Sequence, residues 1–286
     1  MTDKEIEWIV KIENAVVALG SYDSEYNTIW EATGFLVGYP SGGDFNKPGK
    51  SYQGFLVTCK HVFKGKKEIV VLFNAKDTGK RQELVLKLLT EAGDKEVWHK
   101  HDNAEIDVAV LPIFGPTLYE AGVDFSAIHV DELTYTMGGA ESDSVNPGDY
   151  VYMLGFTTDT VGHKRKTVIY KSGIVSTLPE DVEGAPPFFF VDIPVFPGGS
   201  GSAIITNPGL NWVSNTRKST INKVIGLASR AVTYEEVARS DQGEKKARVV
   251  FIENQGLTYV YPSKYIIEII EQGFFKKNRR TINPSS

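Results

Sequence analysis

Gly198-Gly199-Ser200-Gly201-Ser202 follows shortly after the apolar run Phe188–Val195. A serine in a glycine-rich turn can expose its hydroxyl while the backbone N–H groups around it stay free of intrachain acceptors. Such amides can stabilise the oxyanion that develops during acyl transfer. Glycine and serine clusters also mark ordinary loops. The turn therefore predicts chemistry only if suitable partner residues occur elsewhere in the chain.

Two such partners precede the turn. His61 comes shortly after the apolar residues 55–57, and Asp107 lies within the apolar segment Ile106–Leu111. A carboxylate in an apolar strand is costly unless it is hydrogen-bonded or paired, and the ring of His61 would satisfy it. A nucleophile, a base and an orienting carboxylate are the three parts of serine-based hydrolysis. We therefore predict that His61, Asp107 and Ser200 form a catalytic triad.

The order of these three residues and the segments around them resemble the trypsin/chymotrypsin-like serine proteases, in particular the bacterial Deg-type members. The resemblance spans most of the chain. It implies an all-β fold of two six-stranded antiparallel β-barrels (chymotrypsin-like), with a short N-terminal helix and a C-terminal helix. The segments that carry it are Thr33–Val37, Val57–Val62, Ile106–Leu111 and Gly198–Ser202.

The resemblance also implies roles for individual residues. The backbone N–H groups of Gly198 and Ser200 would form the oxyanion hole. Ser229 would hydrogen-bond the triad carboxylate, and Ser229, Ala231 and Gly256 would bind substrate. Pro194 stands six residues before Ser200, where a preference for Lys or Arg would need an acid. We therefore expect a small or medium apolar side chain at the cleavage site.

The nucleophile loop departs from the secreted members of the family. Those enzymes have an aspartate immediately before the catalytic serine, which pairs with an N-terminus released by cleavage, but here the residue is Gly199. We therefore expect no activation by N-terminal cleavage. Because glycine tolerates many backbone conformations, we also expect the peptide between Gly198 and Gly199 to flip between active and inactive forms.

Other chemistries fit the sequence less well. The α/β-hydrolase elbow requires glycine where Ser202 stands, and it would place a histidine after the nucleophile. The chain has a single cysteine, Cys59, which we expect to be a small buried residue. With one cysteine no internal disulfide can form, and we therefore expect a reducing, cytoplasmic location. Segment 99–102 (His-Lys-His-Asp) indicates a surface loop because further metal ligands at suitable spacing are missing. We expect no metal and no cofactor.

Composition and patterning define the organisation. Short strands alternate with turn residues, and no apolar run reaches the ~18 residues of a membrane span. The net charge of −5 is spread along the chain, so we expect neither a nucleic-acid nor a membrane partner. We predict a first unit, 1–120, with the N-terminal helix and the barrel carrying His61 and Asp107. The second unit, 121–286, would hold the barrel carrying Ser200, and a C-terminal helix whose Ile266, Ile269 and Ile270 dock on that barrel.

Two segments look like insertions. Residues 39–53 predict a long hairpin loop. Residues 234–254 are highly charged and border the expected substrate pocket, so a solvated hairpin and a regulatory or partner-binding flap both remain open. We also expect no PDZ domain, which many Deg-type proteases carry, after the terminal helix.

These observations predict a cytoplasmic serine endopeptidase acting on protein or peptide substrates through an acyl-enzyme. Two alternatives remain. One is a catalytically silent binding module that keeps the fold without the chemistry. The other is a protease that stays dormant until a regulatory protein partner orders its loops.

Overall fold

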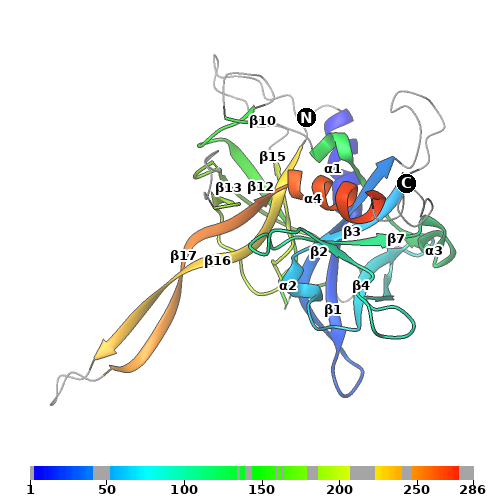
Figure 1. The fold of residues 1–286 in the computed structure, drawn as a ribbon, viewed down its shortest axis with the longest axis horizontal. Helices are drawn as coiled ribbons and strands as arrows, with labels where there is room; N and C mark the ends of the chain where they lie inside the picture. The colour runs from blue at the N-terminus through cyan, green and yellow to red at the C-terminus, as the bar shows by residue number, and fades with distance from the viewer. Residues whose placement is uncertain are drawn as a thin grey trace.

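A computed structural model describes residues 3–40, 52–133, 136–138, 144–158, 160–162, 164–178, 186–206, 223–239 and 247–276. Within them the chain forms two main sheets, whose strands pair antiparallel apart from one short parallel pairing in the first sheet (Figure 1). The strands of the first sheet are β1 (Val16–Tyr22), β2 (Thr28–Pro40), β3 (Tyr52–Thr58), β4 (Glu68–Ala75), β5 (Arg81–Lys87), β6 (His99–Lys100), β7 (Ala109–Ile113), β8 (Val123–Asp124) and β9 (Ile128–His129). Their order is β5-β4-β1-β2-β3-β7-β6, with β8 beside β4 and β9 beside β2. Nine strands replace the predicted six because short strands such as β8 and β9 join the sheet.

The second sheet has the six strands that the sequence predicts. They are β12 (Tyr150–Gly155), β13 (Ile169–Ile174), β14 (Phe189–Asp192), β15 (Ala203–Thr206), β16 (Val224–Arg239) and β17 (Ala247–Pro262), in the order β13-β12-β15-β16-β17-β14. An isolated bridge between Val175 and Val191 brings the two end strands of this sheet together. A separate parallel pair consists of β10 (Thr136–Met137) and β11 (Ser144–Val145).

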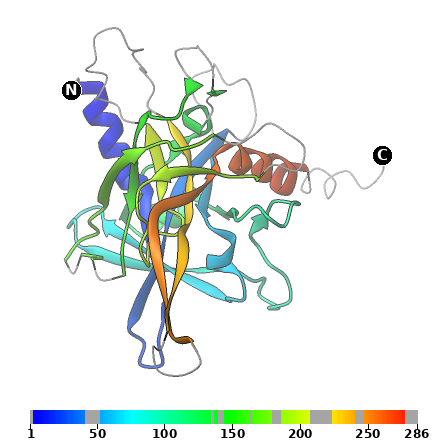
Figure 2. The same ribbon diagram turned by 90° about the vertical axis from the view of Figure 1, so that its left-hand side faces the viewer.

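Helices lie at both ends of the described chain, as predicted. The terminal helices are α1 (Asp3–Ala15) and α4 (Lys264–Ile269), and α4 continues into the π-helical η2 (Ile270–Phe275). Three short helices lie between them in the described chain: α2 (Lys60–Phe63), α3 (Gly115–Glu120) and the 3₁₀ turn η1 (Val130–Leu133). Figure 2 shows α1 and the α4–η2 helix on opposite sides of the sheets. No helix in these residues is long and apolar enough to span a membrane.

The C-terminal helix docks differently from the prediction. Ile266, Ile269 and Ile270 are buried as expected. The aromatic contacts of η2, however, are with the first sheet, because the ring of Phe274 packs on Phe55 at 5.2 Å and on His99 at 5.9 Å between centroids. The helix that ends the described chain therefore packs against β3 and β6 rather than on the second sheet alone.

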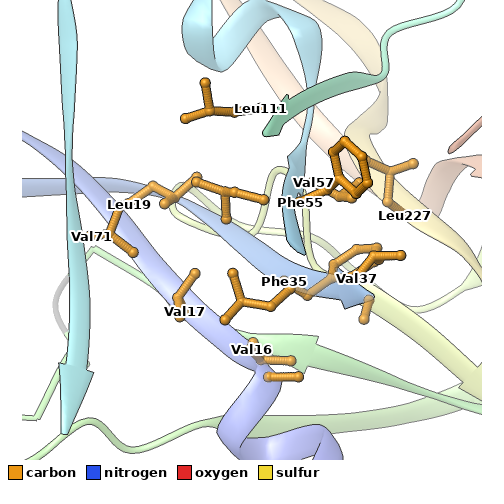
Figure 3. Packing of buried hydrophobic residues seen from close by; sticks show 14 of the residues in the cluster. Val16, Val17, Leu19, Phe35, Val37, Phe55, Val57, Val71, Leu111 and Leu227 are labelled. Carbon is orange, nitrogen blue, oxygen red and sulfur yellow. The ribbon is translucent and has the colours of Figure 1, made fainter. Parts of the chain in front are cut away.

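The two sheets share a continuous apolar core. Phe35 and Phe55 of the first sheet have no exposed surface, and Leu227 of the second sheet belongs to the same buried cluster (Figure 3). A second, smaller cluster lies within the second sheet around Val191 and Ile225. The division of the chain at residue 120 stays a prediction.

A long two-stranded ribbon leaves this body. The outer parts of β16 and β17 pair with each other and project away from the rest of the described chain (Figure 1). The register between the two strands is irregular from Ala228 to Thr233, where the ribbon emerges. The described parts of the charged segment, residues 234–239 and 247–254, lie in this ribbon. Whether the segment serves as a solvated hairpin or a partner-binding flap stays open.

Lys166 caps the end of α1 from within the core. Its side chain is almost fully buried, and Nζ donates hydrogen bonds to the carbonyls of Glu13 (3.1 Å), Asn14 (3.3 Å) and Val16 (2.7 Å). The three N–H groups of the ammonium thus meet three carbonyls, two of them in the last turn of α1, where helix carbonyls have no intrahelical donor. Burial lowers the pKa of Lys166 to about 8, although the negative charges of Asp124 and Glu13 act to raise it.

This burial predicts a pH-dependent stability. Between pH 8 and 10.5 the unfolded chain binds a proton at Lys166 that the folded chain has lost, so the free energy of unfolding rises with pH in this window. From the lower to the upper end of this window, we expect the free energy of unfolding of the wild type to rise by on the order of 3 kcal/mol more than that of Lys166→Met. Urea unfolding of both proteins at the two ends of the window measures it, and a constant difference between them would contradict the prediction.

Candidate active site

His61 and Asp107 meet because their strands are neighbours. His61 lies in α2 directly after β3, and Asp107 directly precedes β7, which pairs with β3 so that Thr58 faces Ala109. Nδ1 of His61 lies 2.6 Å from Oδ2 of Asp107, and the backbone N–H of His61 donates to Oδ1 at 2.9 Å. Half of the His61 side chain is exposed, against 17% for Asp107. The imidazole is thus anchored on one edge and open on the other.

A serine from the second sheet completes the environment of the carboxylate. Oγ of Ser229, in β16, donates to Oδ2 of Asp107 at 2.7 Å. Burial alone would raise the pKa of Asp107, but the hydrogen bonds and charge of His61 and the hydroxyl of Ser229 outweigh it and hold this pKa below its ordinary value. Asp107 is therefore an ionised hydrogen-bond acceptor at neutral pH.

A buried thiol lies beside this pair. Cys59 is fully buried, its Sγ donates to the carbonyl of Ala228 at 3.3 Å, and burial raises its pKa. Cys59, His61 and Asp107 each offer a metal-ligand atom within 4.8 Å of the others. All three groups are already engaged in hydrogen bonds, and a metal would need the thiolate that burial disfavours. We therefore interpret the cluster as a hydrogen-bond network.

The nucleophile loop begins with a tight turn. In the segment 196–199, the N–H of Gly199 donates to the carbonyl of Phe196 at 2.9 Å, and Gly198 has φ of 93°. Proline followed by a residue with positive φ is typical of a type II turn. A Cβ on Gly198 would also lie 2.7–2.8 Å from backbone atoms of Thr157 and Thr158. Only glycine fits this position.

Two amides of the loop have no acceptor among the described residues. These are the N–H groups of Gly198 and Ser200. The carbonyl of Pro197 accepts from the N–H of Thr158 at 3.2 Å, so in a trans peptide the N–H of Gly198 points the opposite way. The two free donors predicted for the oxyanion hole are therefore present as unpaired groups.

The predicted flip of the peptide between Gly198 and Gly199 meets an obstacle. Its carbonyl accepts from Oγ1 of Thr33 at 2.8 Å, and its N–H donates to Phe196. Both ends of the peptide are thus held, and a flip would break both hydrogen bonds. The structure contains one arrangement of the loop, in which this peptide is anchored.

The hydroxyl of Ser200 is hydrogen-bonded away from the imidazole. Oγ donates to the backbone carbonyl of Ser229 at 2.8 Å, and the described contacts include no hydrogen bond between Ser200 and His61. Ser229 therefore contacts both ends of the arrangement, with its hydroxyl on Asp107 and its carbonyl on Ser200.

The other two predicted site residues lie on neighbouring strands. Ala231 of β16 pairs with Thr258 of β17, and Gly256 lies two residues before Thr258. The N–H of Gly256 donates to Oδ1 of Asn254, whose Nδ2 donates to the carbonyl of Val195 at 3.0 Å. This chain of contacts links the predicted substrate-binding strand to the segment that leads into the nucleophile loop.

A cavity of about 780 Å³ opens beside His61 and Asp107. Its wall includes three residues that the sequence did not single out, Phe188, Arg230 and Tyr261. The ring of Phe188 packs on Tyr259 at 4.7 Å between centroids, and the Arg230 guanidinium lies 4.8 Å from the same ring. The cavity therefore combines an aromatic wall with charged side chains of both signs, since Lys60 and Glu105 line it as well as Arg230.

The chain is similar to known proteins in sequence and in fold. A family model described as a trypsin-like peptidase domain matches residues 32–210. No curated protein matches the chain. Two similar solved structures are titled human heparin binding protein (TM-score 0.48, 10% identity, 91% of this chain and 90% of that chain) and atomic resolution structure of HBP (TM-score 0.46, 11% identity, 92% and 91%).

The contacts of Ser229 predict a measurable change at Asp107. Ser229→Ala removes one hydrogen bond to the carboxylate, so the pKa of Asp107 should rise toward its ordinary value. A ¹³C NMR titration of the aspartate carboxyl groups measures this. Asp23, whose lowered pKa depends on its own loop, serves as the internal control and should not move. An unchanged Asp107 titration would contradict the assigned hydrogen bond.

Proposed function

The chain belongs to the trypsin-like peptidase family, and from that premise we propose that it is a serine endopeptidase that hydrolyses peptide bonds through an acyl-enzyme. The observation that carries the proposal is the 2.6 Å hydrogen bond between Nδ1 of His61 and Oδ2 of Asp107. It fixes the tautomer in which Nε2 is free to accept a proton. Ser200 is joined to this pair through Ser229.

The proposed reaction uses only groups of this chain and water. Oγ of Ser200 attacks the carbonyl carbon of the scissile peptide, and its proton passes to Nε2 of His61. Asp107 stays ionised and stabilises the imidazolium. The C–N bond then breaks, the leaving amine takes the proton from His61, and Ser200 carries the acyl group. A water molecule then attacks the ester carbonyl and gives a proton to His61. As the ester bond breaks, His61 returns this proton to Oγ of Ser200, and the carboxylic acid product leaves.

The charge on the tetrahedral intermediate requires donors that are already in place. The N–H groups of Gly198 and Ser200 are the proposed oxyanion hole. Their lack of intrachain acceptors supports this role, because no hydrogen bond must break before they bind the oxygen. The turn that holds Gly198 at φ 93° keeps this geometry between turnovers.

The proposed enzyme does not depend on an N-terminus released by cleavage. The residue before the nucleophile is Gly199, which offers no carboxylate for a new amino group. Thr33 and Phe196 instead hold the loop at this position. Order in the nucleophile loop comes from the neighbouring strand β2 rather than from a salt bridge.

Protein or peptide substrates follow from the peptidase family. We propose that the substrate lies extended along Ser229–Ala231, with Gly256 on the neighbouring strand leaving room for its side chain. The cavity wall of Phe188, Arg230 and Tyr261 supports contact with further residues of the substrate. The aromatic rings favour apolar side chains there, while Lys60, Glu105 and Arg230 bring charges of both signs to the same wall.

A second candidate is a resting form of the same enzyme. Its support is the hydrogen bond from Ser200 to the carbonyl of Ser229, which directs the hydroxyl away from His61. A substrate or a regulatory partner that donates a backbone N–H to this carbonyl would release the hydroxyl. Activity would then appear only in the presence of that molecule.

Active-site labelling tests the proposal. A fluorophosphonate probe should label the wild type covalently and leave Ser200→Ala unlabelled. Ser202→Ala is the matched control, because the Ser202 hydroxyl is buried and has no hydrogen-bond partner, so its removal costs little. Labelling of Ser200→Ala, or none of the wild type with or without peptide, would contradict the enzyme. Labelling of the wild type only with peptide present would identify the resting form.

Removal of the carboxylate tests the triad. Asp107→Asn should lower kcat for a peptide substrate by about 10⁴-fold, because an amide favours the wrong tautomer of His61. Asp102→Asn, at an exposed position in the same connection, should retain the wild-type rate. Steady-state kinetics on the three proteins decides the matter, and a near-normal rate in Asp107→Asn would remove Asp107 from the triad.

A further inference from the structure

The β16–β17 ribbon has two free edges. From the pair Thr233–Asn254 to the pair Arg239–Ala247, each strand is hydrogen-bonded only to the other within the described residues. The flanking strands pair only with the parts of β16 and β17 next to the body. The pairing of β15 with β16 goes no further than Leu227, and that of β14 with β17 goes no further than Leu257. An isolated two-stranded ribbon is marginally stable in water. Its length therefore suggests that something covers it.

The edge formed by β17 is strongly apolar. Val250, Phe251 and Ile252 are consecutive and remain 51%, 50% and 68% exposed. Side chains alternate along a strand, so Phe251 lies on one face of the ribbon and its two neighbours lie on the other. Soluble proteins protect exposed edges with charges, prolines or bulges. This stretch of β17 contains no such residue.

The edge formed by β16 is protected by charge. Glu235 pairs with Ile252 and Glu236 pairs with Phe251, and both acids are exposed. Antiparallel pairing of two β16 edges would bring these like charges together, which is destabilising. The two edges of one ribbon thus differ, and only the β17 edge is suited to receive another strand.

We propose that the β17 edge pairs antiparallel with the β17 edge of a second copy of this chain, giving a dimer joined by a four-stranded sheet. The two-fold axis of such a pairing is perpendicular to the sheet, so a residue faces itself or one an even number of positions away. With the axis at Phe251, its ring meets its own copy and Val250 faces Ile252 twice. Of the three axes through these residues, this one alone pairs Val250, Phe251 and Ile252 entirely with one another, with Glu253 opposite residue 249. An axis at Val250 would set residue 248, an arginine, against Ile252, and an axis at Ile252 would set Phe251 against Glu253.

A second copy is the occupant because the edge complements itself. The register centred on Phe251 forms apolar pairs on both faces of the sheet, and Glu235 and Glu236 remain on the outer strands, in solvent. The ribbon also projects clear of the body, so two bodies need not collide (Figure 1). This dimer does not depend on the proposed catalysis.

Light scattering coupled to size exclusion tests the dimer between about 1 and 100 μM, a range in which weak dimers dissociate. We expect a dimer for the wild type. For Phe251→Lys we expect the dissociation constant of the dimer to rise at least about tenfold. Tyr234→Lys is the matched control, because Tyr234 is a half-exposed aromatic residue on the same face but on β16. It should remain a dimer. Circular dichroism verifies that each variant is folded.

A cysteine at the axis tests the register. Phe251→Cys should form a covalent dimer under mild oxidation, since residues directly opposite in antiparallel strands lie within disulfide range. Tyr26→Cys, at an 84% exposed position on another hairpin, should not. The native Cys59 is fully buried and stays out of the reaction. No cross-link at position 251 would overturn this register.

Two further outcomes overturn the dimer itself. One is a wild type that stays monomeric over the whole concentration range. The other is a Phe251→Lys variant that still dimerises like the wild type. If the wild type is monomeric and Phe251→Lys slows cleavage of a long unfolded protein but not of a short peptide, the edge binds substrate strands instead. That result is distinguishable from failure of catalysis, which would affect both substrates.

Discussion

The hydrogen bonds of Thr33 connect the nucleophile loop to the first sheet. Its N–H donates to the carbonyl of Ser200 and its Oγ1 donates to the carbonyl of Gly198, both at 2.8 Å. The same Oγ1 accepts from the N–H of Phe156 at 3.0 Å. Thr33 is fully buried, so these polar groups have no water to replace their partners. The loop of one sheet is therefore held by a strand of the other, and the site forms at the contact between them.

Close approach of backbones follows from this contact. A Cβ on Gly201 would lie 2.0 Å from the carbonyl oxygen of Thr33 and 2.4 Å from Oγ1 of Thr58, and the φ of Gly201 is +88°. Glycine is the residue that allows both the conformation and the distance. The glycine pattern around Ser200 thus has a packing cause in addition to the chemical one, since the loop must fit against β2.

The sequence predicted those features that depend on local pattern. Asp107 was identifiable because a carboxylate in an apolar strand needs a partner, and the β3–β7 pairing supplies His61. The cavity wall of Phe188, Arg230 and Tyr261 was not, because its residues come from separate segments whose meeting depends on the curvature of the second sheet. The number of strands in the first sheet, the docking of the C-terminal helix and the anchoring of the Gly198–Gly199 peptide likewise depend on long-range contacts.

The irregular register between Ala228 and Thr233 has a mechanical consequence. Ser229 lies inside it, with one hydrogen bond to Asp107 and another from Ser200. Beyond it the two strands contact only each other, so a displacement of the ribbon acts on the main body through this irregular segment. A tilt there would reorient the carbonyl and the hydroxyl of Ser229 together, and with them the contacts of Ser200 and Asp107.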